Sequence, residues 1–335
     1  MAINKFAIDF DSLFTNIYKL GSGLVLSEPT VAAVDNCGKG VVKFAGIDAR
    51  KLIGKTTKNT KIVFPVFESE IVNEKVASSL LNGFLSKVKD GNAFSTVSCL
   101  FSVPCGCTYE QILKLKRVAK ACGVRKTSFV EAPILSALGQ RIPLSDSKPF
   151  FVIDMAGGVT NIAVVSLDGI IVGISVNFGY NKVSTDIIDY LSEKNALQIG
   201  LLTAEKLKNN VGSLEADDAL SLVVNGRDLS TGNPTALNVK AMDIFEPIKI
   251  YYDKIIELSL DLLKKLPPEV SAEIRNSGVY VSGIASKMYG LEKYMSDAFN
   301  MKVNVAEKGE MSVALGGGVL LGNSNLLKKL EVKYN

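Results

Sequence analysis

Two short segments of the chain, one near its start and one near its middle, follow the same plan. Residues 6–9 read Phe-Ala-Ile-Asp, and residues 150–154 read Phe-Phe-Val-Ile-Asp. Each is an apolar run that ends in an aspartate and is followed by a turn and a second apolar run. This pattern predicts a buried strand, a tight turn and another strand. Because one copy opens each half of the chain, we predict two related halves.

The rest of the chain alternates strand-like runs with segments of helical periodicity, which predicts an α/β fold. Helices are expected at residues 76–88, 110–122, 132–139, 184–193, 203–211 and 244–266, the last of them stopped by Pro267 and Pro268. At roughly 150 residues per domain, 335 residues suffice for about two domains. The polar, proline-bearing stretch 141–149 is expected to connect them.

The composition excludes several functional classes. The chain has no histidine, which rules out Ser-His-Asp and Cys-His nucleophile pairs. With 47% apolar and 21% charged residues, it is globular rather than disordered. No uninterrupted apolar stretch reaches the roughly 18 residues that a membrane-spanning helix needs. A net charge of +4 without a basic stripe does not predict a nucleic-acid partner.

The five cysteines are Cys37, Cys99, Cys105, Cys107 and Cys122. The start of the chain lacks a secretory signal pattern, so we expect a cytoplasmic protein with reduced thiols. Cys105 and Cys107 cannot complete a four-ligand zinc site without histidine or another cysteine pair. We expect them to behave as small buried hydrophobic residues.

The strongest candidate for a phosphate-binding turn is residues 154–160, Asp-Met-Ala-Gly-Gly-Val-Thr. Glycine permits positive φ in a tight turn and lets backbone N–H groups approach a phosphate closely. Asp154, at the end of a strand, is placed to hold Mg²⁺ through water. The alternative is an ordinary hairpin with a solvated aspartate. Glu205 and Lys208 share one helical face, which by itself indicates a surface ion pair.

The order of the motifs adds information that no single motif carries. The segments are GLVLSEPTV (23–31), SVPCGCT (102–108), FVEAP (129–133), VIDMAGGVTNIAVVSL (152–167), TAEKLK (203–208), LPPEV (266–270), VYVSG (279–283) and ALGGG (314–318). Together with the turn after Asp9, this order resembles MreB, the bacterial actin homologue of rod-shape determination. MreB belongs to the superfamily of actin, sugar kinases and heat-shock chaperones. The resemblance covers essentially the whole chain.

The resemblance implies an α/β, actin-like ATPase fold of two ribonuclease-H-like domains, with four subdomains, around a nucleotide cleft. Domain I would span residues 1–140, with a small subdomain at about 32–70. Domain II would span 141–314, with a small subdomain at about 180–243. Residues 315–335 would return to domain I, and the hinge would lie at 140–148.

The same resemblance implies a site for ATP and Mg²⁺. Asp9 and Asp154 would flank the metal, and Glu131 would orient the attacking water. The remaining nucleotide-binding positions carried over are Asp9, Ser12, Thr15, Gly157, Gly158, Thr160, Glu205, Lys208 and Gly283. Such a site supports slow phosphoryl transfer without histidine.

Several turn residues depart from the family pattern. Asp11 replaces the glycine that lies against the phosphates, and Phe14 replaces an asparagine. A carboxylate about 4 Å from a phosphate charge repels it by roughly 1 to 4 kcal/mol. Ala156 replaces a further glycine, the family's GGD reads Gly-Tyr-Asn at 179–181, and Ile284 follows Gly283. We therefore expect weak nucleotide binding and, at most, slow hydrolysis.

The expected function is that of a filament subunit that stacks head to tail with itself or with paralogous subunits and acts in cell shape. One alternative is a nucleotide-independent scaffold that co-assembles with an active paralogue. Another is a kinase or chaperone-type ATPase of the same superfamily. For peripheral contact with the inner membrane, the candidates are the loop at 90–96 and the tail at 326–330. A hairpin turn and a docked terminal helix are the respective alternatives.

Overall fold

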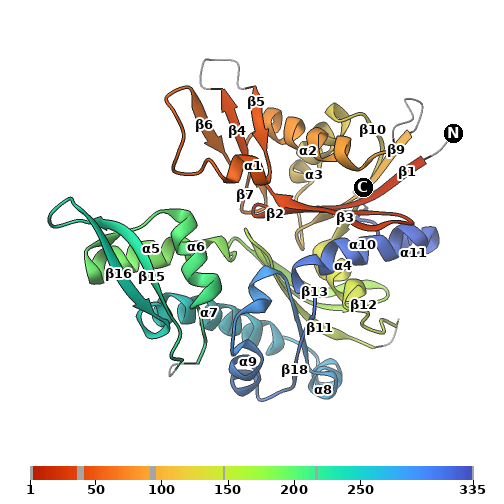
Figure 1. Ribbon diagram of the computed structural model, residues 1–335. Coiled ribbons are helices and arrows are strands. Elements are labelled where there is room, and N and C mark those ends of the chain that lie inside the picture. Colours follow the sequence, from red (N-terminus) through yellow and green to blue (C-terminus); the bar gives the residue numbers. More distant parts are fainter. Residues whose placement is uncertain (1–2, 36–40, 91–95, 146–147, 216–217, 334–335) are drawn as a thin grey trace.

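The computed structural model describes residues 3–35, 41–90, 96–145, 148–215 and 218–333. Two five-stranded sheets, one in each half of the chain, form its framework (Figure 1). The first sheet has the strand order β10-β9-β1-β2-β3, with bounds β1 Ile3–Phe10, β2 Phe14–Lys19, β3 Gly23–Pro29, β9 Thr96–Val103 and β10 Val124–Glu131. The second has the order β13-β12-β11-β17-β18, with bounds β11 Phe150–Met155, β12 Thr160–Ser166, β13 Gly169–Val176, β17 Val279–Ser282 and β18 Val303–Val305.

The two sheets have the same topology. In each, three consecutive strands pair antiparallel. The first of these three also pairs in parallel with a fourth strand, and the fourth pairs in parallel with a fifth. The prediction of two related halves is therefore confirmed. The register matches as well, because Asp9 lies opposite Asn16 in the first hairpin and Asp154 lies opposite Asn161 in the second.

The central strands of the second sheet are covered on both faces. Every residue of β11 and β12 is buried, as the continuous apolar runs predict for strands without a solvated side. Phe151 and Ile153 pack into the core of the second half, whereas Phe150 and Val152 pack into a cluster that also contains Ala7. Successive side chains of one strand therefore serve two different cores.

Helices α4 (Ala132–Gly139) and α10 (Ser312–Gly322) lie side by side between the two sheets (Figure 1). Their contact depends on glycine. A Cβ atom on Gly316 would lie 1.8 Å from the Leu135 carbonyl oxygen, and one on Gly139 would lie 1.9 Å from the Ser312 carbonyl oxygen. In the glycine run at residues 316–318, Gly316 thus packs against α4, whereas Gly317 packs against Ala7 of β1 and Gly318 against the Tyr18 ring of β2.

Two smaller sheets extend from the framework. One contains β4 (Ala32–Asp35), β5 (Val42–Ala45) and β6 (Thr60–Val63), beside helix α1 (Ile47–Arg50). The other contains β14 (Leu197–Gln198), β15 (Ser221–Asp228) and β16 (Pro234–Lys240), with helices α5 (Asn181–Asn195) and α6 (Leu201–Asn210). They fall in the regions expected for small subdomains, whose boundaries stay a prediction.

Among the remaining elements, two helices agree with the expected ranges 76–88 and 110–122, whereas the helix at Pro268–Ser277 and the short strands at Val66–Phe67 and Glu70–Ile71 are not among those expected. The remaining elements are β7 Val66–Phe67, β8 Glu70–Ile71, α2 Glu74–Val88, α3 Tyr109–Ala121, α7 Phe245–Leu263, α8 Pro268–Ser277, α9 Leu291–Phe299 and α11 Ser324–Leu330, with 3-10 turns at Ala241–Ile244, Ile284–Lys287 and Gly309–Met311. The expected helix at 244–266 is shorter, because α7 ends at Leu263. Pro268 then opens α8, where its missing N–H has no helical partner to lose.

The expectations for thiols and membrane contact have mixed outcomes. Cys99, Cys105 and Cys122 are buried free thiols and Cys107 is partly buried, while Cys37 and residues 91–95 lie outside the described residues. Of the helices in the described part of the chain, none is long and apolar enough to cross a membrane. The tail at 326–330 belongs to α11, whose Leu330 is buried, so the docked-helix interpretation holds.

Candidate functional site

Two aspartates stand at equivalent places in the two halves. Asp9 lies near the end of β1 and Asp154 near the end of β11. Each accepts a hydrogen bond from a serine on the adjacent parallel strand. The Ser102 hydroxyl donates to Asp9 Oδ1 at 2.7 Å, and the Ser282 hydroxyl donates to Asp154 Oδ1 at 3.1 Å. The predicted metal-flanking pair therefore faces one cavity from opposite sheets.

The carboxylates of this cavity crowd one another. Burial, followed by the charges of Asp11 and Asp154, raises the pKa of Asp9 to about 8. Burial raises the pKa of Asp154 to about 6, with a further contribution from Asp11, against hydrogen bonds that lower it. Carboxylates held in a low-dielectric site favour a neutralising cation.

Asp11 points across the cleft. It lies in the turn after β1, and its Oδ2 accepts the N–H of Leu13 at 3.3 Å and the N–H of Gly157 at 2.9 Å. Its Oδ1 accepts the N–H of Gly158 at 3.3 Å. Burial raises the pKa of Asp11, and these backbone hydrogen bonds oppose the shift. The residue that departs from the family pattern thus connects the two turns directly.

Gly157 and Gly158 are required for close approach rather than for backbone conformation. Neither is among the glycines with positive φ, so the expectation of positive φ in this turn is wrong. A Cβ on Gly157 would lie 2.4 Å from the Leu13 Cβ, and one on Gly158 would lie 2.5 Å from the Ser12 Oγ. The first turn therefore packs directly on the second.

Two asparagines that the sequence interpretation overlooked also join the halves. Asn16 Nδ2 donates to the Glu310 carbonyl oxygen at 3.1 Å, and Asn161 Oδ1 accepts the Cys105 N–H at 3.1 Å. Both asparagines lie opposite the aspartates described above, in the pattern Asp-x₅-Thr-Asn-Ile that starts at residues 9 and 154. The repetition of this spacing in both halves was the sequence signal that could have identified Asn16 and Asn161 as site residues.

The two threonines of this pattern bond within their own halves. The Thr15 hydroxyl lies 2.9 Å from that of Thr30, and the Thr160 hydroxyl donates to the Phe178 carbonyl oxygen at 2.8 Å. Both side chains are fully buried. Ser12, by contrast, contacts the other half, because Asn181 Nδ2 donates to its Oγ at 3.0 Å. A ligand-binding role for the two threonines stays a prediction.

Glu131 ends β10 and immediately precedes α4. Its Oε1 accepts the N–H of Gly106 at 2.7 Å. Burial raises the pKa of this carboxyl, and the hydrogen bond from Gly106 lowers it. The next residue, Ala132, lines the cavity that contains Asp9 and Asp154. The role of Glu131 in orienting water stays a prediction.

Two of the predicted nucleotide-binding residues, Glu205 and Lys208, lie in a second cavity, next to α6. Glu205 forms an ion pair with Arg50 of α1, across the cleft. Lys208 is buried, donates to the Tyr180 carbonyl oxygen at 2.9 Å, and holds its ammonium 3.6 Å from the centre of the Tyr180 ring. Burial lowers the pKa of Lys208 to about 7, which Glu205 opposes and Arg50 reinforces. The alternative of a surface pair between Glu205 and Lys208 is wrong.

Gly283 is the one predicted site glycine with positive φ, at 87°, and a Cβ there would lie 2.1 Å from the Met155 carbonyl oxygen.

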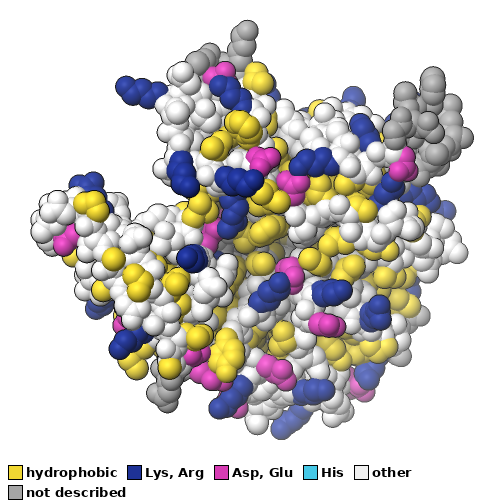
Figure 2. Space-filling model, viewed as in Figure 1, with side chains coloured by type: hydrophobic (Ala, Val, Ile, Leu, Met, Phe, Trp, Pro, Cys, Tyr) yellow, Lys and Arg dark blue, Asp and Glu magenta, His cyan; other side chains and the backbone are white. Residues whose placement is uncertain are grey.

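The cavity around the aspartates measures about 290 Å³ and the one beside α6 about 350 Å³. Four residues line both cavities: Leu13, Phe14, Ile284 and Lys287. In Figure 2, hydrophobic side chains lie in the recess between the β4–β6 part and the α6 part of the molecule.

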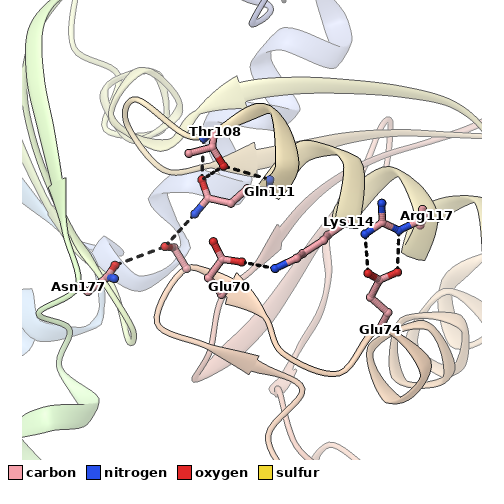
Figure 3. Close-up of polar contacts among 8 residues, drawn as sticks. Glu70, Glu74, Thr108, Gln111, Lys114, Arg117 and Asn177 are labelled. Atoms are coloured by element: carbon pink, nitrogen blue, oxygen red, sulfur yellow. Dashed lines mark hydrogen bonds and ion pairs between the residues drawn. The ribbon is translucent and has the colours of Figure 1, made fainter.

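A further contact joins the halves near α3. Ser69 Oγ lies 3.4 Å from Asn177 Oδ1 and accepts from Gln111 Nε2 at 3.3 Å. Figure 3 shows Gln111 and Asn177 facing this point, with the Lys114–Glu70 and Arg117–Glu74 ion pairs alongside. Contacts between the halves thus extend well beyond the two turns.

These residues accommodate the predicted ligands only in part. The carboxylates of Asp9 and Asp154 are the kind of donor that Mg²⁺ prefers. However, the described residues contain no group of three or more acidic, cysteine or histidine side chains that could hold a metal. A phosphate group reaches the Gly157 and Gly158 N–H groups only if it displaces the Asp11 carboxylate, which already accepts their hydrogen bonds.

Comparison with known proteins decides the family. Residues 3–329 match the MreB/Mbl protein family. The chain belongs to the MreB/Mbl family. It is 30% identical to the cell shape-determining protein MreB of Escherichia coli K12, over 96% of this chain and 94% of that protein. It is 29% identical to the cell shape-determining protein Mbl of Bacillus subtilis 168, over 99% and 100%.

A solved structure of the family has the same fold. MreB 5 of Spiroplasma citri, bound to AMPPNP, superposes with a TM-score of 0.91 at 27% identity, over 97% of this chain and 98% of that one. The actin-like α/β fold expected from the sequence is therefore confirmed. The MreB resemblance read from the motif order is confirmed as well.

Proposed function

We propose that the protein is a subunit of an actin-like cytoskeletal filament that acts in determining cell shape. The observation that carries this proposal is the match to the MreB/Mbl family over residues 3–329. It is supported by relatives of nearly equal length whose names describe cell-shape determination. A heterologous head-to-tail contact between subunits generates an open filament when its rotation does not close into a ring.

The proposal includes weak binding of a nucleotide in the cleft. Its support is the AMPPNP-bound relative with the same fold and the second cavity, beside α6, which Glu205 and Lys208 line. Binding is expected to be weak because a phosphate must first displace the Asp11 carboxylate from Gly157 and Gly158. When bound, Mg²⁺·ATP would supply a phosphoryl group activated for transfer to water. Asp9 and Asp154 would hold the metal, and Glu131 would orient the water.

Electron microscopy of the purified chain tests the filament proposal. We expect protofilaments at high protein concentration, alone or with a paralogous MreB subunit, both with and without Mg·ATP. Material that stays monomeric at high concentration under all four conditions would contradict the proposal. Sedimentation of the same samples measures the assembled fraction.

Specific interactions favour a second version of the same function, a scaffold that needs no nucleotide. The two halves already contact each other through Asp11, through the Ser12–Asn181 hydrogen bond and through the Arg50–Glu205 ion pair. Calorimetry with Mg·ATP distinguishes the two versions. Measurable heat that saturates supports the weakly binding filament subunit, and no saturable heat supports the scaffold.

A further inference from the structure

We propose that Asp11 is a built-in substitute for a nucleotide phosphate, which holds the two halves of the cleft together without a ligand. For its consequence in assembly, this inference rests on the proposed function above. The contact itself is a property of the single chain and is testable without filaments.

The first argument is the chemistry of the contact. Converging backbone N–H groups of glycine-bearing turns form a concave site for an anion. The Asp11 carboxylate accepts the N–H groups of Gly157 and Gly158 from the opposite turn and that of Leu13 from its own turn. One anion therefore receives donors from both halves, as a phosphate between two phosphate turns would.

The second argument is the closeness of the turns. A single Cβ added to Gly157 would lie 2.5 Å from Asp11 Oδ2 and 2.4 Å from the Leu13 Cβ. A phosphate group is larger than a methyl group. It can reach these N–H groups only if the first turn withdraws.

The third argument is that neighbouring contacts favour the same closed arrangement. Asn181 donates to Ser12 at 3.0 Å, beside the Asp11 contact. The backbone N–H of Asn181 donates in turn to the Gly157 carbonyl oxygen at 2.9 Å, which ties the start of α5 to the second turn. Gly179 permits this packing, because a Cβ there would lie 2.2 Å from the Gly158 carbonyl carbon.

A tethered anion has an advantage over a free one. Because the fold already holds Asp11 beside Gly157, this carboxylate competes as an intramolecular group, for which an effective concentration on the order of millimolar is a lower bound. A free phosphate compound must exceed this concentration or bind more tightly. Asp11 therefore competes with anionic ligands for the turn and takes their place in closing the cleft.

The test measures hydrogen exchange at the Gly157 and Gly158 amides and the binding of inorganic pyrophosphate by calorimetry. Both are measured on monomeric protein below its assembly concentration. In the unaltered chain we expect protected amides, whose exchange pyrophosphate does not change. In Asp11→Gly we expect exchange to be faster by about tenfold or more, in line with the loss of a charge-assisted hydrogen bond. Pyrophosphate should restore the protection and bind about tenfold more tightly than to the unaltered chain.

Two further variants make the result specific. Asp11→Asn keeps the size and one acceptor of the side chain but removes its charge, and it should shift both measurements in the same direction by less. It also carries the test if Asp11→Gly does not fold. Asp261→Asn removes the same charge from the exposed side of α7, and it should leave both measurements unchanged. If the amides exchange equally fast with and without the Asp11 carboxylate, the inference is wrong.

Assembly provides the consequence for function. Sedimentation of the unaltered chain should not depend on Mg·ATP, whereas that of Asp11→Gly should increase with it. If the exchange results agree with the inference and no filament forms in either protein, the proposed function fails and the Asp11 contact stands. If filaments form but the exchange results disagree with the inference, the proposed function stands and the inference about Asp11 is wrong.

Discussion

Ser102 and Ser282 occupy equivalent positions in the two halves of the molecule. Each lies on the parallel strand next to the one that carries an aspartate, and each hydroxyl donates to that aspartate, Ser102 to Asp9 and Ser282 to Asp154. The topology of the two sheets brings this about, because β1 pairs in parallel with β9, which carries Ser102, and β11 pairs in parallel with β17, which carries Ser282. The internal repeat thus extends from the fold to the polar contacts of the cleft.

Replacing Ser282 by alanine should destabilise the protein by about 1–2 kcal/mol. The change leaves a buried carboxylate without one of its donors, and unsatisfied buried groups carry most of such a cost. Urea denaturation measures the free energy of unfolding. Ser86→Ala is the matched control, because Ser86 is exposed on α2 and bonds only to a carbonyl oxygen of its own helix. Equal stability of the two variants would contradict this account.

The ion pair between Arg50 and Glu205 should couple α1 to α6. Both side chains are partly shielded from water, so a double-mutant cycle with alanine should give a coupling free energy of about 0.5–1 kcal/mol. Because the pair is electrostatic and not fully buried, the coupling should shrink in molar salt. Thermal unfolding of the four proteins at low and high salt checks both statements, and strictly additive effects would show that the pair contributes nothing.

Lys208 should make stability depend on pH. Burial lowers the pKa of Lys208 to about 7, against 10.5 for an ordinary lysine, so between these values the unfolded chain binds a proton that the folded chain does not. The free energy of unfolding therefore rises with pH across this window, by up to about 1.4 kcal/mol per unit from this group. Below pH 7 the charged ammonium is buried beside Tyr180 and Arg50, with Glu205 as its partial partner, and the gain is absent.

The variant Lys208→Met isolates this effect. The difference in unfolding free energy between the unaltered chain and the variant should shift in favour of the unaltered chain between pH 7 and pH 9. Denaturation in urea at each pH measures it. Parallel pH profiles for the two proteins would mean that Lys208 keeps an ordinary pKa in the folded state.

Gly316 should tolerate no side chain. A Cβ at this position would meet the Leu135 carbonyl oxygen at 1.8 Å, so Gly316→Ala must push α10 away from α4, at an expected cost of about 3 kcal/mol. Gly83→Ala in the middle of α2 is the control, because open space surrounds its Cβ position. That change should stabilise the protein by about 0.5–1 kcal/mol through helix propensity. Thermal unfolding distinguishes the two, and similar effects would contradict the packing argument.

The sequence determined much of the fold by itself. The apolar runs that end at Asp9 and Asp154, and the helix at Ala132–Gly139, follow from local periodicity and local turn chemistry. These signals involve residues close together in the chain, whose side chains alternate or repeat on one face. The motif order then indicated the MreB family, and with it the cleft.

The tertiary structure alone decided which groups the candidate site residues contact. The contact between Asp11 and Gly157 joins residues that are 146 positions apart, and no local pattern specifies which group lies opposite a turn. For the same reason, the sequence shows that residues 157, 158 and 316 are glycines, but it does not show which atoms an added Cβ would contact. Close packing between distant segments turns an apparent defect of the phosphate turn, the Asp11 carboxylate, into the group that connects the two halves.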